Sequence, residues 1–284
     1  MRVIEEAYAK INLVLDITGK RADGYHNIRT VMQTVDLYDT LEFDISESSE
    51  FRISLTCSNA DRYPDIPWDE TNLMAKAARA LCEKYDKHVN IHINIRKNIP
   101  SGAGMARGSA DAACVLCTLN TCLRLGLGTD ELYEIGASLG ADVPFCITGG
   151  TALCEGIGEI ITPLPSLLGL TMICVKPEAS ISTRYIYEQI DAPSYRAAHP
   201  DVDAFVAALQ GHKDISPFLG NYLEPAAMSC APAISEASRA LLGAGCSAVL
   251  MTGSGSAVFG ICKDIDTAKQ ILDSVPGSFM VTAK

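Results

Sequence analysis

The sequence predicts a mixed α+β fold with two layers and two domains. Segments in which apolar and polar residues alternate are interleaved with segments in which apolar residues recur at helical spacing. The length of 284 residues suits one large or two medium domains, and we expect two, each with its own core. Hydrophobic residues make up 48% of the chain and charged residues 20%, which is typical of a globular protein.

The N-terminal segment predicts antiparallel hairpins. Residues 7–16 alternate, so we expect a strand with one apolar face and one polar face. A turn over residues 20–28 and a second strand over residues 30–45 follow. The apolar face holds Ala7, Ala9, Ile11, Leu13 and Leu15, and the opposite face holds Tyr8, Lys10, Asn12, Val14 and Asp16.

A helix and a further strand precede a glycine-rich loop. Residues 69–85 have helical spacing, and residues 88–100 alternate until Pro100 ends the strand. The expected buried positions are Leu73, Ala77, Ala80 and Leu81 on the helix, and Val89, Ile91, Ile93 and Ile95 on the strand.

Two helices follow the glycine-rich loop. The first is predicted from Ser109 to Leu123, and the second has Thr129 as its N-cap and ends at Gly140. Residues 140–156 predict a turn that leads into a strand. 

The domain boundary is expected at the end of that strand. The first domain then covers residues 1–155 and the second covers residues 156–284. In chain order, the second contains a strand over 170–177, a helix over 183–190, a polar stretch over 191–202, further helices, strand-forming sequence over 247–262, and a last helix and strand.

The net charge of −11 argues against a nucleic-acid partner, because binding a polyanion needs a basic face and no basic run is visible. No apolar run reaches the roughly 18 residues of a membrane-spanning helix, so we expect no membrane partner. Glu5, Glu6 and Lys10 interrupt the region where a signal peptide would be apolar, so we expect a cytoplasmic protein.

The eleven cysteines predict reduced thiols rather than disulfides, because they are scattered through apolar segments. Cys114 and Cys117 form a C-x-x-C pair, but the pair lies within a helical pattern and lacks a second pair or nearby histidines. We therefore expect no structural metal site.

The glycine-rich loop is the first candidate for a functional site. Gly102, Gly104 and Gly108, with small residues between them, leave the backbone nearly bare just before a helix, which favours phosphate binding. The loop is not a P-loop, because no G-x-x-x-x-G-K-[ST] motif occurs. It is not a G-x-G-x-x-G motif either, because Arg107 occupies the position of the third glycine. A flexible connection between strand and helix remains the alternative.

Several polar residues are weaker candidates when each is taken alone. Ser109 and Asp111 fit either an N-cap with an acid near the helix dipole or, for Ser109, a hydroxyl on a magnesium ion. Lys10 and Asn12 lie about 6.6 Å apart on one strand face, so one ligand could contact both. Asp142 lies on a tight turn, where acids are commonly structural.

Two further segments have open alternatives. Tyr25 and His26 fit either a clamp for a planar base or a turn closed by a packed tyrosine. The segment "TGSGSAVFG", with Gly253 and Gly255, fits either a bulged hairpin or a second backbone surface facing phosphate.

Taken together and in order, these segments resemble the GHMP kinases. The segments "AYAKINLVLDI", "DGYHNI", "IPSGAGMARGSADAA", "LGADVPFCITGGTALCEGIGE" and "MTGSGSAVFGIC" carry the resemblance over nearly the whole chain. The first, second and fourth single out the branch that acts on 4-diphosphocytidyl-2-C-methyl-D-erythritol, a small-molecule cytidyl diphosphate. The other open readings are a mevalonate- or homoserine-type kinase and a non-catalytic nucleotide-binding relative.

The resemblance implies a ribosomal-protein-like βαβ domain, a ferredoxin-like C-terminal domain, and an active site in the cleft between them. It implies transfer of phosphate from ATP, with magnesium, to the 2-hydroxyl of the substrate in the non-mevalonate route to isoprenoids, by a monomer or homodimer. The implied residues are catalytic Lys10 and Asp142; substrate-binding Asn12, Tyr25, His26 and Tyr187; and, for the nucleotide, Asn72, Lys97, Pro100, Ser101, Gly102, Ala103, Gly104, Met105, Ala106, Arg107, Gly108, Ser109 and Ala110.

Arg107 departs from the family pattern, which has glycine there. If residue 107 has positive φ, a non-glycine residue costs on the order of 1 to 2 kcal/mol. Arg107 then either adds a cation to the phosphates of ATP or narrows the site.

Overall fold

The structure, a computed structural model, describes all 284 residues and divides into two compact units. Unit 1 comprises residues 1–9, 37–101 and 106–148, and unit 2 comprises residues 10–36, 102–105 and 149–284. Two long strands, β1 (Arg2–Lys20) and β2 (His26–Glu47), contribute residues to both units.

Unit 1 contains a sheet in the order β3-β4-β2-β1, in which β3 spans Arg52–Cys57 and β4 spans Val89–Arg96. Strand β4 is parallel to β3 and antiparallel to β2. The alternation predicted for β4 is confirmed, because Ile91, Ile93 and Ile95 are fully buried, although Val89 at the strand end is only half-buried. The strand ends at Arg96, before Pro100.

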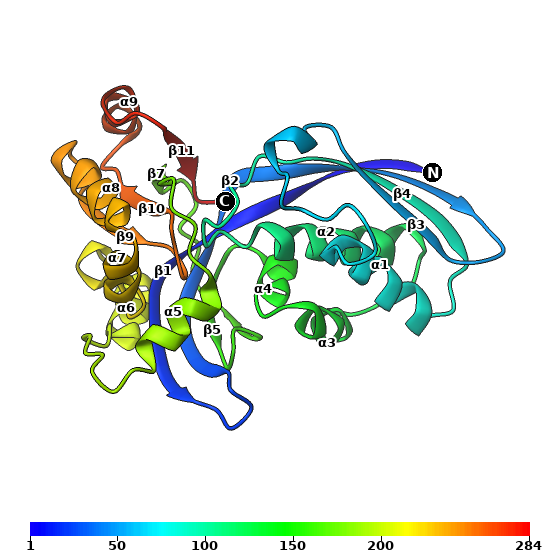
Figure 1. Ribbon diagram of the computed structural model, residues 1–284, viewed down its shortest axis with the longest axis horizontal. Coiled ribbons are helices and arrows are strands. Elements are labelled where there is room, and N and C mark those ends of the chain that lie inside the picture. The colour runs from blue at the N-terminus through cyan, green and yellow to red at the C-terminus, as the bar shows by residue number, and fades with distance from the viewer. The chain divides into compact units, whose positions relative to one another are not determined.

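Four helices lie on one face of this sheet (Figure 1). They are α1 (Leu73–Lys84), α2 (Arg107–Cys122), α3 (Thr129–Leu139) and α4 (Val143–Thr148), and a short 3-10 helix, η1, covers Ala60–Arg62. The predicted stripe on α1 is partly wrong, because Leu73 and Ala80 are half-buried. Helix α1 contacts α2, α3 and β3, so its buried arc is wider and is formed by Met74, Ala75, Ala77, Ala78, Leu81 and Cys82.

Three helix boundaries in unit 1 differ from the prediction. Helix α2 begins at Arg107, so Ser109 lies inside the first turn and is not the N-cap. Gly128 is the N-cap of α3, and its N–H donates to Oε2 of Glu131, 3.0 Å away. Residues 143–148 form α4 rather than a turn, since a proline at the second helical position needs no hydrogen-bond acceptor.

Unit 2 contains a second, antiparallel sheet in the order β11-β7-β10-β9, covered by α8 and α9. Its apolar core includes Ile173, Ile234, Leu241 and Val258. Strand β5 pairs with β2 and with β6, and strand β8 pairs with β1. Bounds in unit 2 are β5 Thr151–Glu155, β6 Ile160–Pro163, β7 Thr171–Val175, α5 Thr183–Ile190, α6 Val202–Gln210, η2 Ser216–Phe218, β8 Gly220–Asn221, α7 Glu224–Cys230, α8 Pro232–Gly243, β9 Ala248–Met251, β10 Val258–Ile261, α9 Ile265–Ser274 and β11 Ser278–Thr282.

The polar stretch after α5 is held by hydrogen bonds within unit 2. The hydroxyl of Tyr195 donates to the carbonyl oxygen of Tyr222, and Nδ1 of His199 lies 2.7 Å from Oδ1 of Asp16. The ring of His199 also stacks on the ring of Tyr222, with centroids 4.4 Å apart. This segment therefore has a defined path without regular secondary structure.

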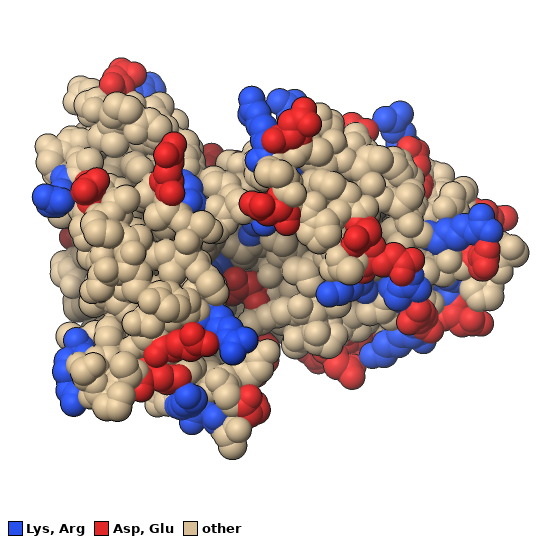
Figure 2. Space-filling model, in the orientation of Figure 1, with Lys and Arg blue, Asp and Glu red and all other residues tan.

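The surface mixes charges of both signs. On the face shown in Figure 2, Lys and Arg side chains are interspersed with Asp and Glu, and no broad region of one sign is visible.

All eleven cysteines are free thiols, and only Cys230 is exposed. None of the helices combines the length and the apolar character needed to cross a membrane.

Candidate active site

The middle of the glycine loop, residues 102–105, is held by the segment that joins β9 to β10. The N–H of Ser256 donates to the carbonyl oxygen of Gly102 at 2.9 Å, and the N–H of Lys10 donates to that of Met105 at 3.3 Å. Gly104 has φ +72°, and a Cβ there would lie 2.2 Å from the carbonyl oxygen of Thr252. No residue with a side chain fits at this position without moving the backbone.

The segment "TGSGSAVFG" forms a hairpin connection, as the first of its two predicted alternatives has it. Strands β9 and β10 pair antiparallel, so residues 252–257 form a hairpin connection. The same residues contact the backbone of the glycine loop. The small side chains of this segment are what let the two backbones approach.

Lys10 and Asn12 lie together inside unit 2. Nζ of Lys10 donates to Oδ1 of Asn12 at 2.7 Å, and the two residues are only 4% and 1% exposed. Nδ2 of Asn12 donates to Thr30, and its backbone N–H donates to the hydroxyl of Thr252, both at 2.9 Å. The predicted polar face of β1 is therefore internal rather than solvated, and the ammonium of Lys10 is held in one place.

The start of α2 shows how the backbone accommodates an arginine at position 107. The positive φ in this part of the loop belongs to Ala106, at +59°, and Arg107 is the first helical residue. The backbone cost expected at residue 107 is thus borne by Ala106, on the order of 1 to 2 kcal/mol. Nη1 of Arg107 is buried and has no hydrogen-bond partner in the protein, so this N–H is an unused donor.

The hydroxyl of Ser109 lies beside the turn that leads to Asp142 in unit 1. Asp142 directly precedes α4, and its carbonyl oxygen accepts from the N–H of Cys146 at 3.1 Å. An ideal Cβ on Gly140 would lie 3.6 Å from Oγ of Ser109, so that hydroxyl lies beside the turn carrying Asp142. Helices α2 and α4 pack together, which keeps these segments adjacent.

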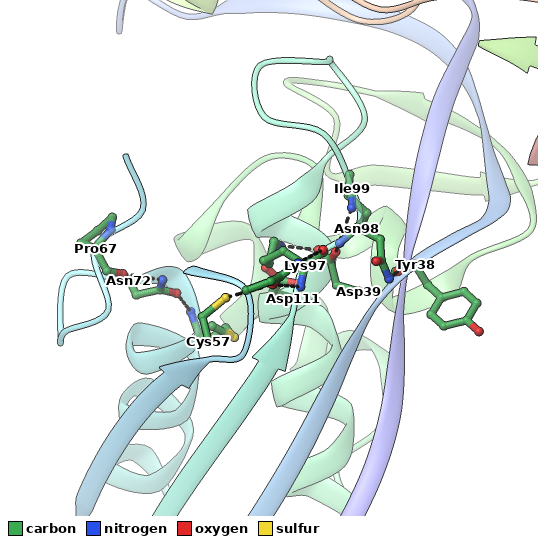
Figure 3. A network of polar contacts seen from close by, with 11 residues as sticks. Tyr38, Asp39, Cys57, Pro67, Asn72, Lys97, Asn98, Ile99 and Asp111 are labelled. Carbon is green, nitrogen blue, oxygen red and sulfur yellow. Dashed lines mark hydrogen bonds and ion pairs between the residues drawn. The ribbon is translucent and has the colours of Figure 1, made fainter. Parts of the chain in front are cut away.

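A buried polar network precedes the glycine loop (Figure 3). Nζ of Lys97 lies 2.6 Å from Oδ2 of Asp111 and also contacts Oδ2 of Asp39. Asp39 accepts hydrogen bonds from the backbone N–H groups of Asn98 and Ile99, the latter at 2.9 Å. Asp39 on β2 and Asp111 on α2 are therefore joined through Lys97. These contacts hold residues 97–99, which lead into the glycine loop.

Two carboxylates share one ammonium in this network. Asp39 is fully buried, and Asp111 is 5% exposed. Burial raises the pKa of Asp111 to about 7, since the charge of Lys97 opposes the effect only in part and the charge of Asp39 adds to it. Oδ1 of Asp111 has no hydrogen-bond partner. The network thus takes up a proton near neutral pH.

Asn72 and Lys97, predicted near the nucleotide, both have structural partners. Oδ1 of Asn72 accepts from the N–H of Met74 at 3.0 Å and caps α1, while its Nδ2 donates to Pro67 at 2.8 Å. The peptide of Lys97 is held by the side-chain amide of Asn59, with bonds of 3.1 and 2.8 Å.

The predicted base-binding residues are partly brought together in unit 2. His26 begins β2 and is 8% exposed, and its ring centroid lies 4.9 Å from that of Tyr187. Nε2 of His26 lies 2.8 Å from Oδ1 of Asp191. Tyr25 is 62% exposed in the β1–β2 turn.

Sequence reasoning missed Asp39 and Asp191. An acid within the alternating stretch before Leu41 was a usable signal for Asp39, because charged residues inside strands are seldom buried without a partner. No local signal identified Asp191, whose partner His26 lies 165 positions away.

Comparison with known proteins gives a consistent family assignment. Models described as "GHMP kinases N terminal domain" and "GHMP kinases C terminal" match residues 72–150 and 195–281. The chain is 42% identical to a 4-diphosphocytidyl-2-C-methyl-D-erythritol kinase of Caldicellulosiruptor saccharolyticus, covering 91% of this chain and 88% of the relative. A relative with the same name in Geobacillus kaustophilus is 40% identical, covering 98% and 94%.

Solved structures are similar over the same length. A crystal structure of 4-(cytidine 5'-diphospho)-2C-methyl-D-erythritol kinase matches with a TM-score of 0.80 and 29% identity, covering 99% of this chain and all of the other. A homoserine kinase from Cytophaga hutchinsonii matches with a TM-score of 0.74 at 20% identity, covering 97% and 94%, which shows a shared fold.

Proposed function

We propose a mechanism from the premise that this chain belongs to the 4-diphosphocytidyl-2-C-methyl-D-erythritol kinase family, within the GHMP kinases. The protein is an α+β kinase that transfers phosphate from ATP to an alcohol, the 2-hydroxyl of 4-diphosphocytidyl-2-C-methyl-D-erythritol in the non-mevalonate route to isoprenoids. The observation that best supports a phosphate site is the glycine loop, whose backbone is held by residues 252–256 and Lys10.

The catalytic roles are assigned to Asp142 and Lys10. Asp142 accepts the proton of the tertiary hydroxyl as its oxygen bonds to the γ-phosphorus, while the bond to the β-phosphate oxygen breaks and its electrons leave with ADP. The ammonium of Lys10, held 2.7 Å from Oδ1 of Asn12, stabilises charge on the transferred phosphoryl group. Because such transition states are loose, orienting the hydroxyl is as important as removing its proton.

The nucleotide phosphates are assigned to residues 100–110. Backbone N–H groups in this segment and the N-terminus of the 16-residue helix α2 favour an anion. Nη1 of Arg107 is the unused donor there, and an arginine suits phosphate oxygens. Asn72, which caps α1, and Lys97, which pairs with Asp39 and Asp111, are assigned near the nucleotide.

Magnesium is assigned to the same end of the nucleotide. Magnesium in nucleotide sites takes only a few protein oxygens as ligands besides the phosphates. The hydroxyl of Ser109, which lies beside the turn that leads to Asp142, is one oxygen that could serve as such a ligand. When bound, magnesium supplies neutralisation of the phosphate charge.

The cytidyl end of the substrate is assigned to Tyr25, His26 and Tyr187, and Asn12, beside Lys10, is assigned to another substrate contact. His26 and Tyr187 already face each other, and the exposed Tyr25 ring adjoins His26 in the chain. An exposed aromatic face suits a stacked base, and a ring nitrogen beside it suits a hydrogen bond along the edge of that base.

The decisive test is release of ADP measured with and without the cytidyl substrate. We expect ADP release that depends on this substrate and is absent with mevalonate or homoserine. ADP release that ignores the cytidyl compound, or that responds equally to the other alcohols, would contradict the proposed substrate.

A further inference from the structure

Nε2 of His26 is the only ring nitrogen of this histidine that has a protein hydrogen-bond partner. It lies 2.8 Å from Oδ1 of Asp191, and Oδ2 of Asp191 lies 2.7 Å from Nζ of Lys20. An ionised carboxylate can only accept a hydrogen bond, so the proton of a neutral imidazole resides on Nε2. Nδ1 then carries a lone pair and is the nitrogen left for a ligand.

Asp191 is kept ionised by its neighbours. Burial acts to raise its pKa, but the hydrogen bonds from Lys20 and His26 outweigh burial, and the pKa of Asp191 lies below its ordinary value. The carboxylate therefore accepts from both groups at neutral pH. Its side chain is 31% exposed, whereas that of His26 is only 6% exposed.

Helix α5 supplies two contacts to the same imidazole. Asp191 is the C-cap of α5, and its N–H donates to the carbonyl oxygen of Tyr187 at 3.2 Å, one helical turn earlier. The rings of Tyr187 and His26 lie 4.9 Å apart at an angle of 38°. Ring contact and hydrogen bond thus come from one turn of one helix, so the imidazole cannot flip without losing the hydrogen bond.

We infer that Asp191 is a positioning residue that fixes the tautomer of His26 and thereby makes His26 discriminate cytosine from uracil. This inference rests on the proposed function, since it concerns the base end of that substrate. Cytosine presents an amino donor where uracil presents a carbonyl acceptor. A lone pair on Nδ1 accepts from the amino group and is repelled by the carbonyl.

The expected preference for cytosine over uracil has the size of one hydrogen bond at the base edge, which cytosine makes with Nδ1 and uracil does not. Such a contact changes affinity by about 10- to 100-fold between the right and the wrong base. We therefore expect the wild-type protein to bind CMP at least about 10-fold more tightly than UMP.

Asp191→Asn tests the assignment, because an amide can turn its NH₂ group toward Nε2 and move the ring proton to Nδ1. Measured by calorimetry at pH 8, above the ordinary titration range of imidazole, CMP binding should weaken and UMP binding should strengthen in this variant. The matched control is Asp203→Asn, another acid of unit 2, whose carboxylate pairs with Arg29 and makes no contact with His26. It should keep the wild-type ratio.

Nitrogen-15 chemical shifts of the His26 ring give a readout that needs no ligand. The wild-type and Asp203→Asn proteins should show the Nε2-protonated tautomer, and Asp191→Asn should show a mixture or the opposite tautomer. An unchanged ratio of CMP to UMP affinity, or an unchanged tautomer, in folded Asp191→Asn overturns the inference. Wild-type protein that shows the expected tautomer but does not bind CMP overturns the proposed substrate instead, and the discrimination with it.

Discussion

The ammonium of Lys97 lies 2.6 Å from a carboxylate oxygen of Asp111, and the side chains of both residues are less than a tenth exposed. The same ammonium also contacts Asp39. Removing the cation leaves two buried carboxyl groups without the ammonium that they share. We expect Lys97→Met to lower the free energy of unfolding by about 3 to 5 kcal/mol in urea titrations. A loss below about 1 kcal/mol would show that the network does not stabilise the fold.

Asp111→Asn should change how stability depends on pH. The pKa of Asp111 is raised from 3.8 to about 7, so between these values the folded state binds a proton that the unfolded state has released. This group therefore makes the wild-type free energy of unfolding fall as pH rises from about 4 to about 7 and then level off. The stability of the variant relative to wild type should rise over that window in urea titrations at pH 4.5, 6 and 8. A constant difference would contradict the raised pKa.

Gly104→Ala should disrupt the glycine loop. Its Cβ would meet the carbonyl oxygen of Thr252 at 2.2 Å, and its φ of +72° is unfavourable for alanine. We expect a loss of more than about 2 kcal/mol in unfolding free energy together with weaker ATP binding. The control is Gly19→Ala, in the same unit, where a Cβ meets nothing within 4 Å. Equal behaviour of the two variants would argue against the close approach seen here.

Arg107→Met should raise the KM for ATP about 10-fold while leaving the stability of the nucleotide-free protein unchanged or higher. The reason is that Nη1 is buried without an acceptor, which costs free energy until a ligand supplies one. Thermal unfolding and initial rates check the two parts separately. Arg107→Lys serves as the control that keeps the positive charge but lacks the planar guanidinium with its paired N–H donors. A higher turnover in Arg107→Gly with unchanged KM would instead support a residue that narrows the site.

Asp142→Asn and Lys10→Ala should each reduce kcat by about 10²- to 10⁴-fold, because each removes a group that acts on the transferring atoms. The dissociation constant for ATP should change by less than about 10-fold, since the loop backbone supplies most of that binding. Normal turnover in either folded variant removes the corresponding assignment.

Local periodicity predicted most of the strands and helices. The alternation of Ile91, Ile93 and Ile95 needs only neighbours on one sheet face, so it was readable from the sequence. Helix α4 was missed because six residues cover less than two turns and show no period. The start of α2 was misplaced by two residues because Ala106, with no side-chain signal, adopts the left-handed conformation.

The sequence offered a set of candidate site residues but not their arrangement. Lys10 and Asn12 were identified from one strand, yet their burial depends on Thr252, which lies 240 positions beyond Asn12. The pairing of Lys97 with Asp39 spans 58 positions. Electrostatic partners at such separations leave no periodic trace in the chain, so only the folded structure reveals them.

The contact between Gly104 and Thr252, 148 positions apart, also sets an order of events during synthesis. A ribosome releases the chain from its N-terminus, so the glycine loop emerges long before the segment that holds it. Until residues 252–256 have left the exit tunnel, the loop lacks the hydrogen bond from Ser256. The hydrogen bonds that hold the middle of the glycine loop therefore form only late in synthesis, after nine-tenths of the chain has been made.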